Sequence, residues 1–235
     1  GATSLQNDML SKLIFGGAIS GAVIASNLEN HSTVNRFGFD VSSRLEYQNF
    51  DHLIKGKYGW MLQIENSFLG SMLYTKDLFH LTFQGNSGSD NGFADVSGTS
   101  VFAIGFQKIG FGFVDQKTKS SIALNYYNIS NYFSLSADKF LMNQSEDFSS
   151  IGIEAKGGYE STSSKDFMKG YGVGIDFDFR IPLNVSDGKD MIIQFTGKNI
   201  GFVNYSKGIS SYSIDSTYSY NGLQFNQLYG DESLF

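Results

Sequence analysis

The sequence predicts an all-β protein, an antiparallel up-and-down β-barrel of about eight to ten strands with a short N-terminal helical segment. Three observations support this fold. Apolar and polar residues alternate over long stretches, polar or glycine-containing stretches separate them, and charged residues make up only 17% of a chain that is 15% aromatic. The length of 235 residues fits one domain, because sandwiches and barrels often have roughly 200–250 residues.

Three segments alternate most clearly, and each is predicted to be a strand: 36–47, 58–68 and 171–181. In the last of them, apolar residues such as Phe177 occupy one face and polar residues such as Asp176 the other. Successive side chains of a strand point to opposite faces, so this pattern indicates a sheet with one apolar and one polar face.

Weaker alternation predicts further strands at 101–106, 121–127, 133–137, 151–155, 191–198 and 212–220. The stretches between strands are predicted at 84–91, 116–119, 160–165 and 186–189. No stretch approaches the roughly 18 apolar residues that a membrane-spanning helix needs. The domain prediction is a helical segment at 1–32 and a β-barrel at 33–235.

The N-terminal segment has helical rather than alternating spacing. We expect two short helices, broken at Gly16 and Gly17, with Asn7 or Asp8 capping the first. They are expected to pack on or inside the barrel, or to act as a plug, gate or partner-docking segment. The apolar residues proposed for that contact are Leu10, Leu13, Ile14, Phe15, Ile19 and Val23.

The polar face carries many Gly and Ser residues, together with charges of both signs. Small side chains and paired charges suit the narrow interior of a barrel, where a charge must find a partner. Aromatic residues near the strand ends, such as Trp60 and Tyr171, suit a membrane–water boundary. We therefore predict a barrel in the outer membrane of a Gram-negative bacterium, in contact with its lipid. The predicted lumen charge row is Arg36, Asp40, Arg44, Glu46, Glu65, Asp176, Asp178 and Arg180.

A soluble β-sandwich that acts as a binding module is the alternative fold, because it shows the same alternation. The net charge of −6 argues against nucleic acid as a partner, since phosphate binding needs clustered Lys and Arg. The absence of Cys excludes thiolate catalysis, thiolate metal sites and disulfides.

The sequence indicates no enzyme, cofactor or metal site. His31, His52 and His80 are widely spaced, whereas a hydrolase triad or a zinc site needs histidine close to its partners. Asp176 and Asp178 could share a proton or a cation, but their neutralisation by Arg180 within the charge row is the preferred interpretation.

Several stretches, taken in order, resemble a Bacteroidota outer-membrane β-barrel family of unassigned function. They are residues 7–17 with Ile19 and Ser20, then 57–60, 77–79, 83–86, 170–176, 199–203 and 212–215. The resemblance implies an export signal, a barrel and no catalytic residue. It also implies a barrel that continues beyond the position of Tyr220. The terminal Phe235 is similar to an outer-membrane assembly signal without the strand that should precede it. The sequence is therefore expected to be a fragment, or a shortened member closed by a partner.

Bacteroidota export many proteins through the type IX secretion system, whose translocon recruits additional outer-membrane or pore-sealing subunits. The expected function is therefore a non-enzymatic accessory or sealing subunit, or plug, of such an envelope protein-export complex. The alternatives are an outer-membrane channel or carrier for small or hydrophobic molecules, and the soluble binding module.

Overall fold

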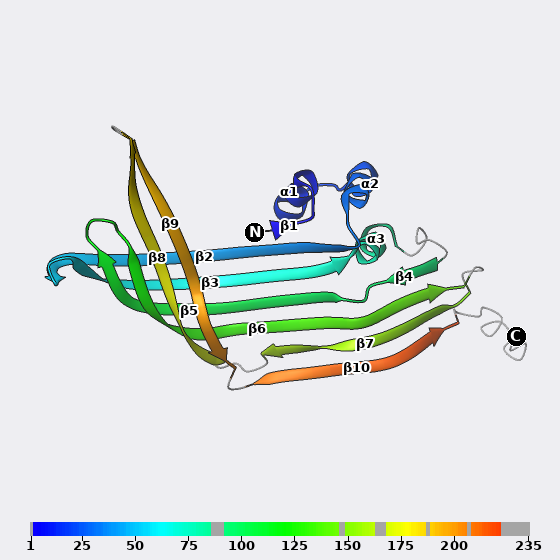
Figure 1. Ribbon diagram of the computed structural model, residues 1–235. Coiled ribbons are helices and arrows are strands. Elements are labelled where there is room, and N and C mark those ends of the chain that lie inside the picture. The colour runs from blue at the N-terminus through cyan, green and yellow to red at the C-terminus, as the bar shows by residue number, and fades with distance from the viewer. Residues whose placement is uncertain are drawn as a thin grey trace, which may run out of the picture.

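The computed structural model describes residues 2–85, 92–145, 149–162, 168–186, 189–205 and 208–221. Long antiparallel strands form one sheet, and three short helices lie on one side of it near one end (Figure 1). The all-β fold class is therefore confirmed. The elements are β1 (Ala2–Thr3), α1 (Asn7–Phe15), α2 (Gly21–Asn30), β2 (Val34–Ile54), β3 (Tyr58–Thr75), α3 (Lys76–Gln84), β4 (Phe93–Asp95), β5 (Thr99–Asp115), β6 (Ser121–Gln144), β7 (Ile151–Thr162), β8 (Gly170–Ser186), β9 (Lys189–Asn204) and β10 (Ile209–Tyr220).

The strands β2 and β3 form a long hairpin with a tight turn. Lys55 and Gly56 both have positive φ angles, 53° and 63°, and the N–H of Lys57 donates to the carbonyl of Ile54. Two central residues with positive φ define the turn that best matches the twist of an antiparallel pair. The pairing of β2 and β3 is regular from Val34 to Asn49, and one register shift, between Asn49 and Ile54, separates it from the turn.

The sheet forks along β6, which sequence analysis had split into two strands at 121–127 and 133–137. These are parts of one strand. Its first part, from Ser121 to Ile129, pairs with β8, and β9 continues that branch. Its second part, from Phe133 to Gln144, pairs with β7, and β10 continues that branch.

The described residues form an open sheet and not the closed barrel expected from the sequence. The strand order is β1-β2-β3-β5-β6, followed by the two branches. Within the described ranges no strand joins β9 or β10 back to β2. The hairpin of β8 and β9 nevertheless branches from β6 and is drawn across β2, β3 and β5, toward the end with the β2–β3 and β5–β6 turns (Figure 1). The expectation about a strand before Phe235 concerns residues outside the described ranges.

The helices pack on the apolar face of the sheet. Met9 of α1 and Phe79 of α3 are buried there against Tyr74 of β3. The two helices on either side of Gly16 and Gly17 are those expected from the sequence, and they lie on the apolar face of the sheet and not on its polar face. The third helix, α3, was not predicted.

Local chemistry explains α3. The Thr75 hydroxyl accepts a hydrogen bond from the N–H of Leu78 at 3.1 Å, which caps the first turn. Leu78, Leu81 and the two phenylalanines at 79 and 83 then repeat at helical spacing. The strand pattern of β3 therefore changes to a helical one at a residue that caps helices.

Candidate functional site: an exposed apolar belt around a buried polar cluster

One face of the sheet exposes large apolar side chains across six strands. Register pairing places Tyr47, Leu62, Phe111, Leu124, Ile175 and Ile200 in a single row across β2, β3, β5, β6, β8 and β9. Exposed fractions run from 38% for Leu62 to 71% for Leu45. We call this surface the apolar belt; it consists of Val41, Leu45, Tyr47, Leu62, Ile64, Phe68, Ile109, Phe111, Phe113, Ile122, Leu124, Tyr126, Val173, Ile175, Phe179, Ile181, Ile193, Phe195, Ile200 and Phe202.

The opposite face buries charge. The Lys108 side chain is fully buried, and its Nζ lies 2.9 Å from Glu65 Oε2 and 2.9 Å from Asp176 Oδ2. Lys108 Nζ also donates to Asn199 Oδ1 at 2.9 Å. Side chains of β3, β5, β8 and β9 thus meet at one ammonium group, and the pairing of β8 with β9 shifts register beside Asn199.

Neutral amides complete this group. Gln63 Nε2 donates to Asn125 Oδ1 and to Asp176 Oδ2, and the N–H of Asn199 donates to Asp176 Oδ1 at 2.8 Å. Asn199 adopts a φ of 58°, a left-handed conformation that asparagine tolerates better than most residues. Buried charges are stable only when paired and hydrogen-bonded, and this arrangement meets that condition. We call it the Lys108 cluster; its members are Gln63, Glu65, Lys108, Asn125, Asp176 and Asn199.

A polar cavity of about 380 Å³ lies beside the Lys108 cluster. Its walls come from both edges of the curled sheet, with Arg44 and Glu46 of β2 on one side and Thr196 and Lys198 of β9 on the other. Arg44 pairs with Glu46, and Arg180 pairs with Asp178 at 2.9 Å. Two pairs of opposite charge therefore lie on the cavity wall, together with Lys119 and Lys198.

Most of the predicted lumen charge row meets here. Arg44, Glu46, Asp176, Asp178 and Arg180 line the cavity, and Glu65 binds Lys108. Arg36 and Asp40 share that face of β2 but lie farther along the strand, away from the cavity.

Lys108, the residue at the centre of the cluster, is not among the residues predicted from the sequence. The signal was present, because Ile109, Phe111 and Phe113 alternate with Gly110 and Gly112. Taken by itself, this run places Lys108 on the face opposite its apolar residues. Alternation continued from the predicted strand at 101–106 instead assigns Lys108 to the face of Ile104 and Phe106.

The apolar residues of the predicted strand at 101–106 lie on the polar face of the sheet. Ile104 and Phe106 are buried with Tyr127 and Ile129 on the same face as Lys108. The assumption that every apolar row of the sheet faces one side is therefore wrong for this part of β5. These residues form an apolar layer beside the Lys108 cluster. Along the strands, this layer lies between the cluster and the end of the sheet that carries the helices.

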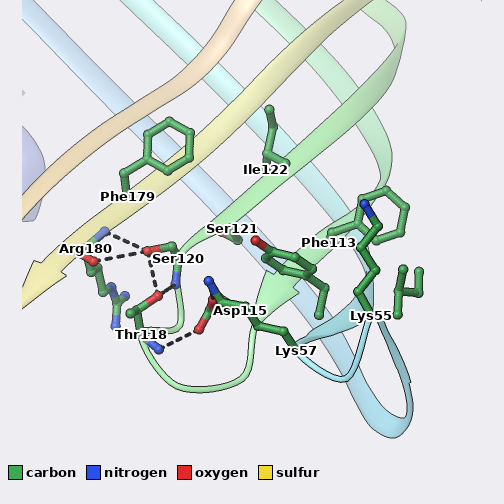
Figure 2. Close-up of a pocket in the computed structure, with 12 residues that line it drawn as sticks. Lys55, Lys57, Phe113, Asp115, Thr118, Ser120, Ser121, Ile122, Phe179 and Arg180 are labelled. Atoms are coloured by element: carbon green, nitrogen blue, oxygen red, sulfur yellow. Dashed lines mark hydrogen bonds and ion pairs between the residues drawn. The ribbon is translucent and has the colours of Figure 1, made fainter.

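The opposite end of the belt is closed by two ordered turns around a hollow of about 650 Å³ (Figure 2). Asp115 accepts hydrogen bonds from the N–H groups of Lys117 and Thr118, both at 2.9 Å, and pairs with Lys57 at 3.0 Å. Ser120 accepts from the N–H of Arg180, which ties the β5–β6 turn to β8 (Figure 2).

The N–H of Thr118 and the ammonium of Lys57 lower the pKa of Asp115 to about 2, from its ordinary value of 3.8. A carboxyl with a lowered pKa stabilises the fold above its unfolded value and loses that contribution as pH falls through the folded one. Between pH 3.8 and about 2, Asp115→Asn should therefore lose less stability than the wild type. Thermal unfolding across this interval measures the difference. Parallel curves for the two proteins would contradict the role of the carboxylate.

The predicted partner or gating segment divides into two groups. Ile19 and Val23 pack against the cluster of Met9, Tyr74 and Phe79. Leu10 is half-buried, whereas Leu13, Ile14 and Phe15 at the end of α1 are exposed.

The three histidines lie apart from the Lys108 cluster. His31 ends α2, where its ring contacts the Tyr74 hydroxyl at 3.0 Å. His52 is in β2 and His80 in α3. Among the described residues, no group of three or more histidine or carboxylate side chains could hold a metal ion. In the same ranges, no helix has the length and apolarity needed to cross a membrane.

The sequence and the structure were compared with known proteins. No family model matches it, and searches of curated proteins and of solved structures find no match.

Proposed function

We propose that this chain forms part of the wall of an outer-membrane β-barrel, with the apolar belt against lipid and the Lys108 cluster facing the interior. The reversed polarity of the sheet carries this proposal. Leu124 is 67% exposed, whereas Lys108 is completely buried. A water-soluble protein places these residue types the other way round.

The height of the belt fits a bilayer. In β3 it runs from Leu62 to Phe68, with Tyr58 and Trp60 continuing the same face to the turn. That span of 58–68 matches the roughly 9–11 residues with which a tilted strand crosses a membrane. At one end the helices cover the face, and at the other Lys55 and Lys57 occupy the turn. Cationic and aromatic residues at these ends suit the headgroup region.

To form a closed barrel, the described sheet needs further strands along its free edges. Unpaired N–H and C=O groups within hydrocarbon cost several kcal/mol each, so open edges do not persist there. The cavity wall already brings β2 and β9 to opposite sides of the same space. Residues of these two strands therefore already line one cavity, which supports a curvature of the sheet toward closure.

The Lys108 cluster supports a sealed barrel interior rather than an open pore. Side chains from four strands meet at Lys108, and Ile104 and Phe106 form an apolar layer beside them. We therefore propose a non-enzymatic accessory or sealing subunit. Its membership of an export complex, such as the type IX translocon, is supported by the sequence resemblance alone.

A channel or carrier is the second candidate, and the charged cavity of about 380 Å³ is the observation that favours it. A plug formed by α1 and α2 would have to lie on the polar face, whereas both helices pack on the apolar one. If the protein conducts, its gate is therefore within the Lys108 cluster.

Reconstitution of the whole chain tests both parts of the proposal. We expect the protein to float with liposomes, to resist extraction by alkaline carbonate, and to leave planar bilayers non-conducting. Flotation with steady ionic current would favour the channel. A protein that stays in solution without detergent would favour the soluble sandwich and would contradict a membrane location.

A further inference from the structure

Helix α1 ends in three consecutive exposed apolar residues. Leu13 is 48% exposed, Ile14 61% and Phe15 85%. Gly16 and Gly17 follow with φ angles of 84° and 133°, so the chain turns away directly after Phe15. Burial of large apolar side chains is favourable, and these three residues are not buried against other parts of the described chain.

The start of α1 is firmly attached to the sheet. Met9 is completely buried against Tyr74 and Phe79, and the N–H of Gln6 donates to Asn27 Oδ1 of α2 at 2.9 Å. The exposed end is therefore held in a definite position.

An apolar hollow of about 300 Å³ adjoins the exposed end of α1. Leu13 forms one of its walls and α3 another, and the strands β2 and β3 form its floor. Its main lining residues are Leu5, Leu13, Phe37, Met72, Phe79 and Phe83.

This hollow is continuous with the apolar belt. The ring of Phe37 lies 6.2 Å from that of Phe39, which lies 5.7 Å from that of the belt residue Phe68. Of the three helices, α1 is drawn nearest to the β8–β9 end of the sheet (Figure 1). The helix thus lies on the lipid-facing side, where the belt ends.

We propose that α1 is a membrane-interface helix, whose Leu13–Phe15 end enters the boundary between headgroups and acyl chains while a lipid acyl chain fills the hollow beside it. This inference rests on the proposed membrane location of the belt. Helices that bind at this boundary bury an apolar face there and keep a cationic side chain at the headgroups, a role that Lys12 can fill. Lipid is the occupant because the belt and the hollow form one surface, and any bilayer around the belt reaches α1.

The chain has no cysteine, so a single introduced thiol labels one site. Phe15→Cys carries a polarity-sensitive fluorophore, in liposomes of phosphatidylglycerol and phosphatidylethanolamine. Leu124→Cys is the reference within the belt, and Glu29→Cys on exposed α2 is the reference for water. Because Phe15 is 85% exposed, its replacement leaves the packing of the chain unchanged.

We expect the Phe15 label to have blue-shifted emission, quenching by brominated lipid, and several-fold weaker quenching by aqueous iodide than the Glu29 label. A water-exposed Phe15 label beside a lipid-buried Leu124 label would overturn this inference and leave the membrane belt intact. It would then favour a protein partner for the end of α1. If the Leu124 label is also in water, the proposed function itself fails.

Discussion

Replacement of Lys108 by methionine should lower the free energy of unfolding by about 3–5 kcal/mol, the cost of leaving a buried charge without its partner. Glu65 and Asp176 would both remain buried without the ammonium group that joins them. Their mutual repulsion would add to the cost of desolvation. Chemical denaturation of the reconstituted protein measures the change.

Two variants separate this effect from a general loss of charge. Lys156→Met removes an exposed pair with Asp215 and should change stability far less. Combining Lys108→Met with Glu65→Gln and Asp176→Asn removes all three charges and should recover much of the lost stability. A Lys108→Met protein as stable as the Lys156→Met protein would show that the cluster is not buried in the folded protein.

Leu124→Arg should destabilise the protein in a lipid bilayer by about 2–4 kcal/mol, as for a cation on the lipid face of a barrel at mid-membrane. Leu124 lies in the middle of the apolar belt, in the row that crosses six strands, and is 67% exposed. Its side chain has few contacts with the chain to lose, so the cost arises from the solvent around it. Refolding into liposomes across a urea series measures it.

The matched control is Glu29→Arg, which introduces the same side chain on exposed α2. It should leave folding into liposomes unchanged. Leu124→Ala distinguishes lost apolar contact from introduced charge, and should cost much less than Leu124→Arg. If Leu124→Arg has no effect and increases solubility in water, the belt faces solvent or another protein, and the proposed membrane location is wrong.

Alternation was sufficient to predict the best strands, because the side-chain period of a strand is local and needs no partner. The segments 36–47, 58–68 and 171–181 all lie within observed strands. Alternation also assigned Arg44, Asp176 and Asp178 to one face, where the cavity brings them together. Alternation alone does not assign Lys108 in this way, because Ile104 and Phe106 of the predicted strand at 101–106 share its face.

Local patterns could not predict the fork of the sheet. Both branches hydrogen-bond to one edge of β6. The alternation at 121–127 and at 133–137 looks the same whether these segments form one strand or two. Whether the two segments form one strand or two depends on which other strands pair with them in the folded sheet. The helix α3 is different, because its cap at Thr75 and its helical spacing are both local features of the sequence.

The sequence by itself determined the fold class, the two faces of each clear strand and the pairing of opposite charges on the polar face. These follow from side-chain periodicity, which is set residue by residue. Only the tertiary structure decided that Glu65, Lys108 and Asp176 meet, that Ile104 and Phe106 face inward, and that the helices cover the apolar face. Strand register and sheet curvature control these contacts, because they bring together residues from β3, β5 and β8 that are far apart along the chain.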